Sequence, residues 1–197
     1  MFSRQFKRPR RGVAAIGALV AAACLFTSAQ ADSELEPCAD AQALERAVVR
    51  LNELRLQADA PCAAARASMQ PLAWESHLAA SAHAQASDLA LRDLLSHVDA
   101  RQRGLGARLR SAGYAAAGAG ENLAAGQTDF DDTMQAWLAS PSHCANLMQP
   151  DFRDVGLACV QRRGSRYERF WVAHLGAPVR PLALSVVQGS GGDVAVR

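Results

Sequence analysis

The sequence predicts an α+β domain in which four helices surround a small antiparallel sheet. Two observations carry this prediction. Apolar residues recur at helical spacing in three segments before residue 140, and stretches rich in β-branched and aromatic residues follow after residue 150. The sequence QRRGS at 161–165 separates two of these late stretches and is typical of a hairpin loop. The late strands are therefore expected to pair as antiparallel neighbours.

The helices are expected over 40–57, 75–95, 106–112 and a fourth segment that begins at Thr128 or Asp129 and ends before Pro141. In the first segment, Leu44 and Leu51 share the apolar face, and Asp40 can cap the helix. Gly113 is a stop signal for the third helix. Trp137 lies on the apolar face of the fourth.

Strands are expected over 155–160 and 167–175, with 121–125 as a third strand. The stretch between the first two helices contains a proline and is expected to be a loop. These elements define one domain over about 38–178. The Gly-rich composition near the C-terminus predicts a flexible tail over 179–197.

Residues 1–31 have the pattern of a secretory signal peptide. Five basic residues precede the apolar stretch Val13–Phe26, and AQA at 29–31 has the form of a cleavage site. Cleavage would leave a short lead over 32–37. The apolar stretch is too short to span a bilayer, so a secreted or periplasmic protein with no membrane span is predicted. Two variants stay open, a lipid anchor at Cys24 and a twin-arginine signal at Arg10–Arg11.

The charge of the chain argues against nucleic acid as a partner. The leader holds five of the 21 Lys and Arg residues and none of the 19 Asp and Glu residues. The remainder has 16 basic against 19 acidic residues, a net charge of −3. Its arginines are scattered rather than gathered in a stripe, so no nucleic-acid partner is expected.

Four cysteines follow the leader: Cys38, Cys62, Cys144 and Cys159. An even number in an exported chain predicts two disulfides, although four cysteines allow three pairings. Proximity in the sequence favours Cys38–Cys62 and Cys144–Cys159. The absence of CxxC spacing argues against a redox motif and a zinc knuckle.

Three polar residues at the ends of expected elements form a candidate site. His97 follows the second helix, Glu121 lies among small residues in GAGENLAAG, and His143 follows the fourth helix. Functional groups are often presented in this way by a rigid scaffold. Two imidazoles and a carboxylate could ligate a divalent cation such as zinc, or form an acid–base cluster. Alternatively, Glu121 could only fasten loops across the sheet.

The remaining histidines have structural interpretations. His77 and His83 lie within the second helix and are expected to be ordinary helix residues. His174 lies in the last strand and is expected to be half-buried and hydrogen-bonded rather than a ligand.

Eight blocks occur in order along the chain: LNELR at 51–55, PLAW at 71–74, LLSH at 94–97, RLRSAGY at 108–114, GENLAAG at 120–126, MQAWLASPSHCANLM at 134–148, DFRDVGLACV at 151–160 and FWVAHLG at 170–176. Together they resemble bacterial SCP-domain members of the CAP superfamily, which comprises cysteine-rich secretory proteins, antigen five and plant pathogenesis-related proteins. The resemblance covers about 44–176.

This resemblance implies a three-layer α-β-α sandwich with a small central antiparallel sheet, and a cleft with two histidines and two glutamates. His97 and His143 match the two histidines, and Glu121 matches the glutamate of the GENL motif. Ser140 stands where the second glutamate is expected, so Ser140 and Asp99 are candidate substitutes. Some family members bind zinc, and the missing glutamate weakens that expectation for this chain.

Two functions are compatible with the resemblance. A non-catalytic binding module could take a small ligand, a lipid or an extracellular protein in the His/Glu cleft, and a monomer is expected. The alternative is a metal- or His/Glu-assisted hydrolase of the peptidase type. No catalytic residue is assigned, because the serines beside the histidines form no recognised triad pattern. A divalent cation such as zinc is the one cofactor considered.

Overall fold

The structure, a computed structural model, describes residues 35–57, 62, 69–179, 187–188 and 194–195. The elements in chain order are β1 Glu36–Pro37, α1 Ala41–Leu56, β2 Ala73–Trp74, α2 Ser76–Arg92, α3 Leu105–Ala112, β3 Ala116–Ala125, α4 Phe130–Ala139, α5 Pro141–Leu147, β4 Asp154–Gln161, β5 Arg169–Pro178, β6 Val187–Gln188 and β7 Val194–Ala195. The signal peptide predicted over 1–31, including Cys24, lies outside the described residues.

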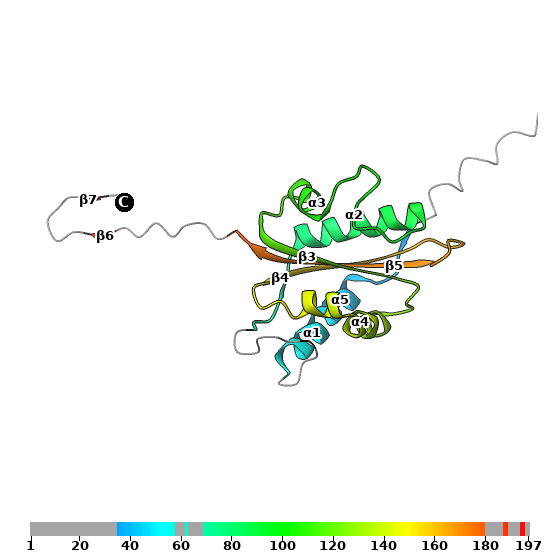
Figure 1. Ribbon diagram of the computed structural model, residues 1–197, viewed down its shortest axis with the longest axis horizontal. Helices are drawn as coiled ribbons and strands as arrows, with labels where there is room; N and C mark the ends of the chain where they lie inside the picture. The colour runs from blue at the N-terminus through cyan, green and yellow to red at the C-terminus, as the bar shows by residue number, and fades with distance from the viewer. Residues whose placement is uncertain (1–34, 58–61, 63–68, 180–186, 189–193, 196–197) are drawn as a thin grey trace, which may run out of the picture. The chain divides into compact units, whose positions relative to one another are not determined.

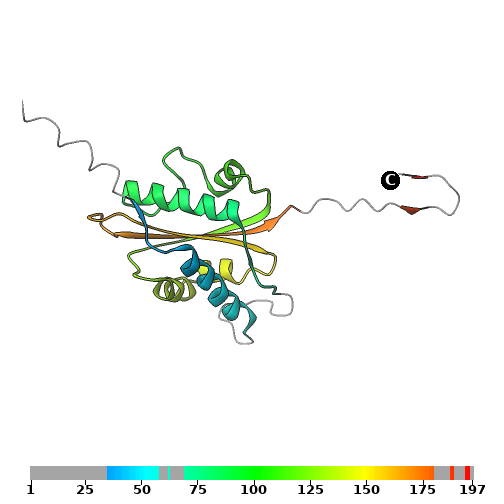
Figure 2. The same ribbon diagram turned by 180° about the vertical axis from the view of Figure 1, so that it is seen from behind.

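The central sheet has the strand order β1-β4-β5-β3, and β2 also pairs with β4. The long pairings, β4 with β5 and β5 with β3, are antiparallel, whereas β2 runs parallel to β4. In both ribbon views, α2 and α3 cover one face and α1, α4 and α5 cover the other (Figures 1 and 2). The predicted three-layer α-β-α sandwich is confirmed.

Because side chains alternate along each strand, the sheet contributes apolar residues to a separate core on each of its two faces. Leu123 and Phe170 pack with α2, whereas Ala124 and Trp171, one residue further along each strand, pack with α1, α4 and α5. The predicted late strands and their hairpin are present, and the third predicted strand extends back to Ala116. Within the tail 179–197, β6 and β7 pair antiparallel.

Helix boundaries follow local capping signals. Asp40 caps α1 by accepting a hydrogen bond from the Ala43 N–H at 2.6 Å, as the sequence predicts. α2 ends before the predicted residue 95, because Asp93 takes a left-handed conformation with φ of 52°. Among the described residues, no helix has the length and apolar character that a bilayer crossing requires.

The sequence prediction missed α5, which carries His143. Pro141 marks the end of α4, but a proline also fits the first turn of a new helix, where its missing N–H costs nothing. The structure places Pro141 at the start of α5, with Ser140 as the residue between the two helices. His143 therefore lies in a helix and not in a loop.

The predicted disulfide pairing is wrong. The bonds join Cys38 to Cys159 and Cys62 to Cys144, with Cα–Cα distances of 5.1 and 6.1 Å. The reason is the topology of the sheet: β1 pairs antiparallel with β4, and the N–H of Cys38 donates to the carbonyl of Cys159 at 3.1 Å. Cysteines distant in the sequence therefore meet across this pairing, while Cys144 of α5 joins Cys62.

Gly156 of β4 lies directly against the backbone of α2. A Cβ at this position would overlap the backbone of Leu78 and Ala79. We expect Gly156→Ala to lower the free energy of unfolding by about 3 kcal/mol, because helix and strand must separate to admit the methyl group. Urea denaturation measures the loss. Gly104→Ala is the control, since its Cβ would meet no atom within 4 Å; equal effects of the two substitutions would contradict the close packing.

Candidate functional site

Glu121 and His174 are cross-strand neighbours in the β3–β5 pairing. Both face the layer of α2 and α3, because each lies two positions along its strand from Leu123 or Val172, which pack on that side. Glu121 is 6% exposed and His174 is fully buried. The isolated carboxylate of GAGENLAAG therefore lies under the helices and must find its partners there.

Both oxygens of Glu121 are occupied. Oε1 lies 2.7 Å from Nδ1 of His97. Oε2 accepts a hydrogen bond from Nη1 of Arg108 at 2.8 Å and lies 2.8 Å from Nε2 of His174. Arg108 also donates from Nη2 to the carbonyl of His97 at 3.0 Å. One buried carboxylate thus connects β3, β5, α3 and the loop after α2.

The charge of this cluster follows from its contacts. Burial alone would raise the pKa of Glu121, but the hydrogen bonds and charges of His174 and Arg108 outweigh it and lower the pKa to about 2. Burial lowers the pKa of His174, although Glu121 opposes that shift. The Nε2 atom of His174 lies 2.8 Å from Glu121 and 3.3 Å from Nη1 of Arg108, so the imidazole sits beside the buried ion pair of Glu121 and Arg108.

His97 presents its ring to solvent. Its side chain is 66% exposed although its partner, the Glu121 side chain, is 3% exposed. Only Nδ1 is bonded in the described part of the chain, so Nε2 is available to a ligand or a proton. A buried, ionised carboxylate therefore orients an exposed imidazole, and the hydrogen bond from Arg108 fixes the peptide that carries it.

His143 approaches from the other layer of the sandwich. Asn122, which faces that layer, donates to the carbonyl of His143 at 3.0 Å and accepts from Asn146 at 3.0 Å. Asn146 also donates to the backbone oxygen of Glu121 at 3.2 Å. The side chain of Asn146 can approach β3 because Gly120 has no Cβ. These contacts hold α5 against the edge strand that carries Glu121.

The structure brings Glu121 and His97 into direct contact, whereas no hydrogen bond joins the His143 ring to either of them among the described side chains. His143 is half-buried. Partial burial, and then the charge of nearby His97, lower the pKa of His143. The two imidazoles therefore interact across the edge of β3 through their charges.

This interaction predicts a measurable titration. We expect the ring protons of His143 to titrate below the ordinary range of histidine, and His97→Ala to raise that pKa, because a neighbouring positive charge is removed. Nuclear magnetic resonance of the histidine Cε1 protons measures both values. His83→Ala, on exposed helix surface, is the control. An unchanged His143 titration in His97→Ala would mean that the imidazoles do not interact.

The two accessory candidates lie apart from Glu121. The Ser140 side chain at the start of α5 approaches only Ser142, at 3.4 Å, among the described contacts. Asp99 is 5% exposed, and its carboxylate accepts from the backbone of Arg101 and Arg103 and from the Arg103 side chain. Asp99 therefore fixes the loop after His97 and does not replace the missing glutamate.

The donors do not fit a zinc site. No group of three His, Cys, Asp or Glu side chains with suitable geometry for a metal occurs in the described ranges. Both oxygens of Glu121 are engaged, and a cation near Oε2 would meet the guanidinium of Arg108 at 2.8 Å from that oxygen. The chemistry of this cluster is that of an ion pair and not of a metal centre.

Sequence reasoning missed two partners of Glu121. Arg108 lies within the RLRSAGY block, but nothing local distinguishes it from other helix arginines. The sequence predicts a half-buried, hydrogen-bonded His174; the structure shows it fully buried, and its contact with Glu121 makes it part of the cluster. Its position two residues from Val172, on the α2 side, is the signal that could have indicated this contact.

Comparison with known proteins agrees with this architecture. The model of the cysteine-rich secretory protein family, CAP, matches residues 48–175. The uncharacterized protein YkwD of Bacillus subtilis is 27% identical over 119 residues, which are 60% of this chain and 43% of that protein.

Two solved structures share the fold. An extracellular protein containing a SCP domain from Bacillus anthracis matches with a TM-score of 0.53 and 24% identity, over 67% of this chain and 40% of its own. An outer surface protein from Borrelia burgdorferi matches with a TM-score of 0.61 and 18% identity, over 73% of this chain and 98% of its own. The chain thus spans less than half the length of the two Bacillus relatives.

Proposed function

Because this chain belongs to the cysteine-rich secretory protein family, we propose that it is an exported, non-catalytic binding module. The cleft consists of His97, Glu121 and His143. Its ligand is a small molecule, a lipid or an extracellular protein, and its working form is a monomer. The fold hosts many activities, so the proposal depends on the site and not on the architecture.

Export is supported by three observations. The N-terminal segment has the pattern of a signal peptide, and the two described disulfides are typical of oxidising compartments. The two solved relatives are named as an extracellular and an outer surface protein. We propose secretion or periplasmic location, with cleavage after residue 31 and a lipid anchor at Cys24 as the variant.

The observation that carries the binding proposal is the exposed imidazole of His97 on the buried, ionised Glu121. Such an imidazole is held in one orientation before a ligand arrives, which reduces the entropy lost on binding. Two features argue against covalent catalysis. All four cysteines after the leader form disulfides, and no described serine hydroxyl is hydrogen-bonded to His97 or His143.

One observation favours the hydrolase as the second candidate. A carboxylate bonded to Nδ1 of a histidine, with Nε2 left open, is the arrangement that orients a general base. His97 could then activate water. Glu121 itself is a poor general base, because its pKa of about 2 is far from neutral pH.

The test compares the native exported protein with His97→Ala and His143→Ala. Native mass spectrometry detects a co-purifying ligand, and a mixed fluorogenic peptide substrate detects turnover. A ligand that both variants lose supports binding. Turnover that His97→Ala lacks supports the hydrolase and overturns the binding module. A protein with neither ligand nor turnover would contradict both functions. Arg50→Gln, at an exposed surface ion pair, is the matched control.

A further inference from the structure

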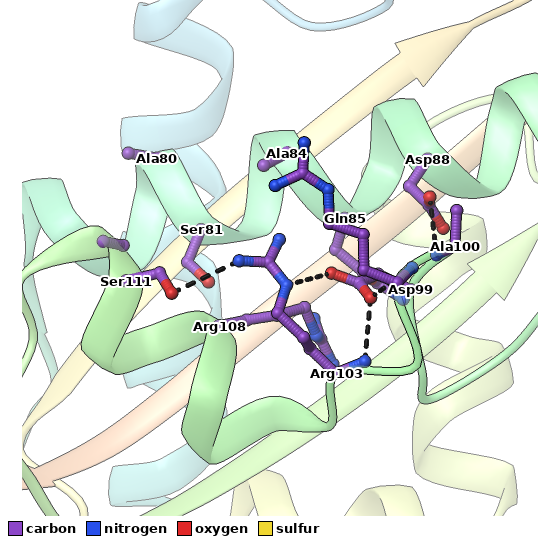
Figure 3. Close-up of a pocket in the computed structure, with 12 residues that line it drawn as sticks. Ala80, Ser81, Ala84, Gln85, Asp88, Asp99, Ala100, Arg103, Arg108 and Ser111 are labelled. Carbon is purple, nitrogen blue, oxygen red and sulfur yellow. Dashed lines mark hydrogen bonds and ion pairs between the residues drawn. The ribbon is translucent and has the colours of Figure 1, made fainter.

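A cavity of about 470 Å³ lies between α2, the loop after it and α3. It is separate from the cleft: His97, Glu121 and His143 are absent from its lining. Figure 3 shows Ser81 and Gln85 on α2 facing the side chains of Arg103 and Arg108 from the loop and α3. Its volume falls in the range of small-molecule sites.

Three residues of the lining each carry a buried polar atom that has no hydrogen-bond partner in the described part of the chain: Ser81 Oγ, Gln85 Oε1 and Arg108 Nε. These residues are 3%, 1% and 5% exposed. A buried polar atom without a partner costs about 1–3 kcal/mol, so native proteins rarely keep several in one place. Their convergence on one cavity indicates a site that an occupant completes.

The neighbouring contacts fix the orientation of these atoms. The amide nitrogen of Gln85 donates to the carbonyl of Ser96 at 2.8 Å, which leaves Oε1 as the free acceptor. The two terminal nitrogens of Arg108 are held by Glu121 and by the backbone of His97, which leaves Nε as the free donor. The residues around the cavity therefore hold one unpaired acceptor, one unpaired donor and one unpaired hydroxyl within the described structure.

The charges of the lining favour an anion. Asp99 accepts hydrogen bonds from Arg103 and from the loop backbone, and Asp88 accepts from Arg92 and from the Ala100 N–H. Both carboxylates are thus satisfied. No carboxylate among the described residues forms an ion pair with Arg101, which also lines the cavity. Within the described ranges, the groups without a partner are the guanidinium of Arg101 and two donors, Arg108 Nε and the Ser81 hydroxyl, against the single acceptor on Gln85.

We propose that this α2–α3 pocket binds a small hydroxylated carboxylate. The carboxylate of the ligand accepts hydrogen bonds from Arg101, Arg108 Nε and Ser81, and a ligand hydroxyl donates to Oε1 of Gln85. The carbon skeleton lies against the alanines of α2 and α3. Arg108 links the pocket to Glu121, but the proposal does not depend on the function of the cleft.

Three ring compounds of similar size test the proposed chemistry. D-Glucuronate carries both the carboxylate and the hydroxyls, D-glucose lacks the charge, and cyclohexanecarboxylate lacks the hydroxyls. Each is titrated into the purified protein while backbone amide shifts are recorded by nuclear magnetic resonance. We expect saturable shifts at Ser81, Gln85 and Arg101, with glucuronate binding at least about tenfold more tightly than the other two.

Two variants locate the binding. Ser81→Ala removes one orphan hydroxyl, and Arg101→Gln removes the unmatched charge from an exposed side chain whose loss leaves the core intact. Each is expected to weaken glucuronate binding at least about fivefold, whereas Arg110→Gln, exposed on α3 outside the lining, leaves it unchanged. Circular dichroism checks the fold, and Arg101→Gln carries the test if Ser81→Ala does not fold.

The proposal is overturned by any of three results: no saturable shift at the pocket, equal affinity for the three compounds, or glucuronate binding that neither variant weakens. Water alone would then satisfy the three buried polar atoms. These outcomes are distinguishable from failure of the proposed cleft function, because Ser81 and Arg101 lie outside the cleft and the variants His97→Ala and His143→Ala lie outside the pocket.

Discussion

Replacing Cys38 and Cys159 with alanine is expected to lower the free energy of unfolding by about 5 kcal/mol. The bond joins residues 121 positions apart, and without it the unfolded chain regains the entropy of that long loop. It also fastens the short strand β1 to β4, where only a few backbone hydrogen bonds hold the pairing. Urea denaturation at neutral pH measures the loss.

The second bond provides a matched comparison. Cys62→Ala with Cys144→Ala opens a loop of 82 residues and is expected to cost about 4.5 kcal/mol, nearly as much, because the entropy grows only with the logarithm of loop length. A loss below about 1 kcal/mol for either pair would show that the bond does not constrain the unfolded chain.

Peptide mapping of the unreduced protein tests the pairing itself. The fragments that carry Cys38 and Cys159 should remain joined until a reductant is added, as should those with Cys62 and Cys144. A fragment joining Cys38 to Cys62 would overturn this arrangement and restore the pairing that sequence proximity favours.

Local signals predicted α1 to α4 and the long strands β3, β4 and β5, because each of these elements is encoded by a pattern within a few residues. Asp129 caps α4 through the Asp132 N–H at 2.9 Å, and Trp137 lies on the face that the periodicity assigns to the core. The disulfide partners were not accessible to such reasoning. Cys38 meets Cys159 only because β1 pairs with β4. Since β1 is two residues long, it has no alternating pattern from which that pairing could be predicted.

The candidate site also contains some residues that local sequence predicts and others that only the fold brings together. Glu121 and His97 could be selected from the sequence because each lies at the end of an expected element, and the structure brings them within 2.7 Å. Arg108 and His174 lie within expected elements and not at their ends, so the criterion that selected Glu121 and His97 does not select them. Their role depends on the register of β3 against β5 and on the angle at which α3 crosses the sheet.

Glu121→Gln is expected to lower the free energy of unfolding by about 4 kcal/mol at pH 7. The amide keeps the shape of the side chain but removes the charge that balances Arg108, whose guanidinium is 5% exposed. A buried cation without its partner is costly, more so than the pair itself is stabilising. Glu53→Gln, at the exposed pair with Arg50, should change stability by less than about 0.5 kcal/mol.

The pH dependence provides an independent check with a defined sign. The pKa of Glu121 is lowered from 4.5 to about 2 in the folded state, so the unfolded chain binds the proton first as the pH falls. The stabilisation is complete above pH 4.5 and is lost between there and pH 2. Glu121→Gln should therefore be less sensitive to acid over this window, and an unchanged slope would contradict the buried ion pair.

A double variant separates the charge from the packing. If the loss in Glu121→Gln comes from the unbalanced guanidinium, then Arg108→Met combined with Glu121→Gln should recover part of it, because no buried charge then lacks a partner. Additive losses would instead assign the effect to lost contacts. Because Glu121 supports the fold and also orients His97, reduced binding or turnover in a Glu121 variant cannot identify its role. The exposed His97 can be removed without that ambiguity, so the proposed binding function is best tested at this imidazole.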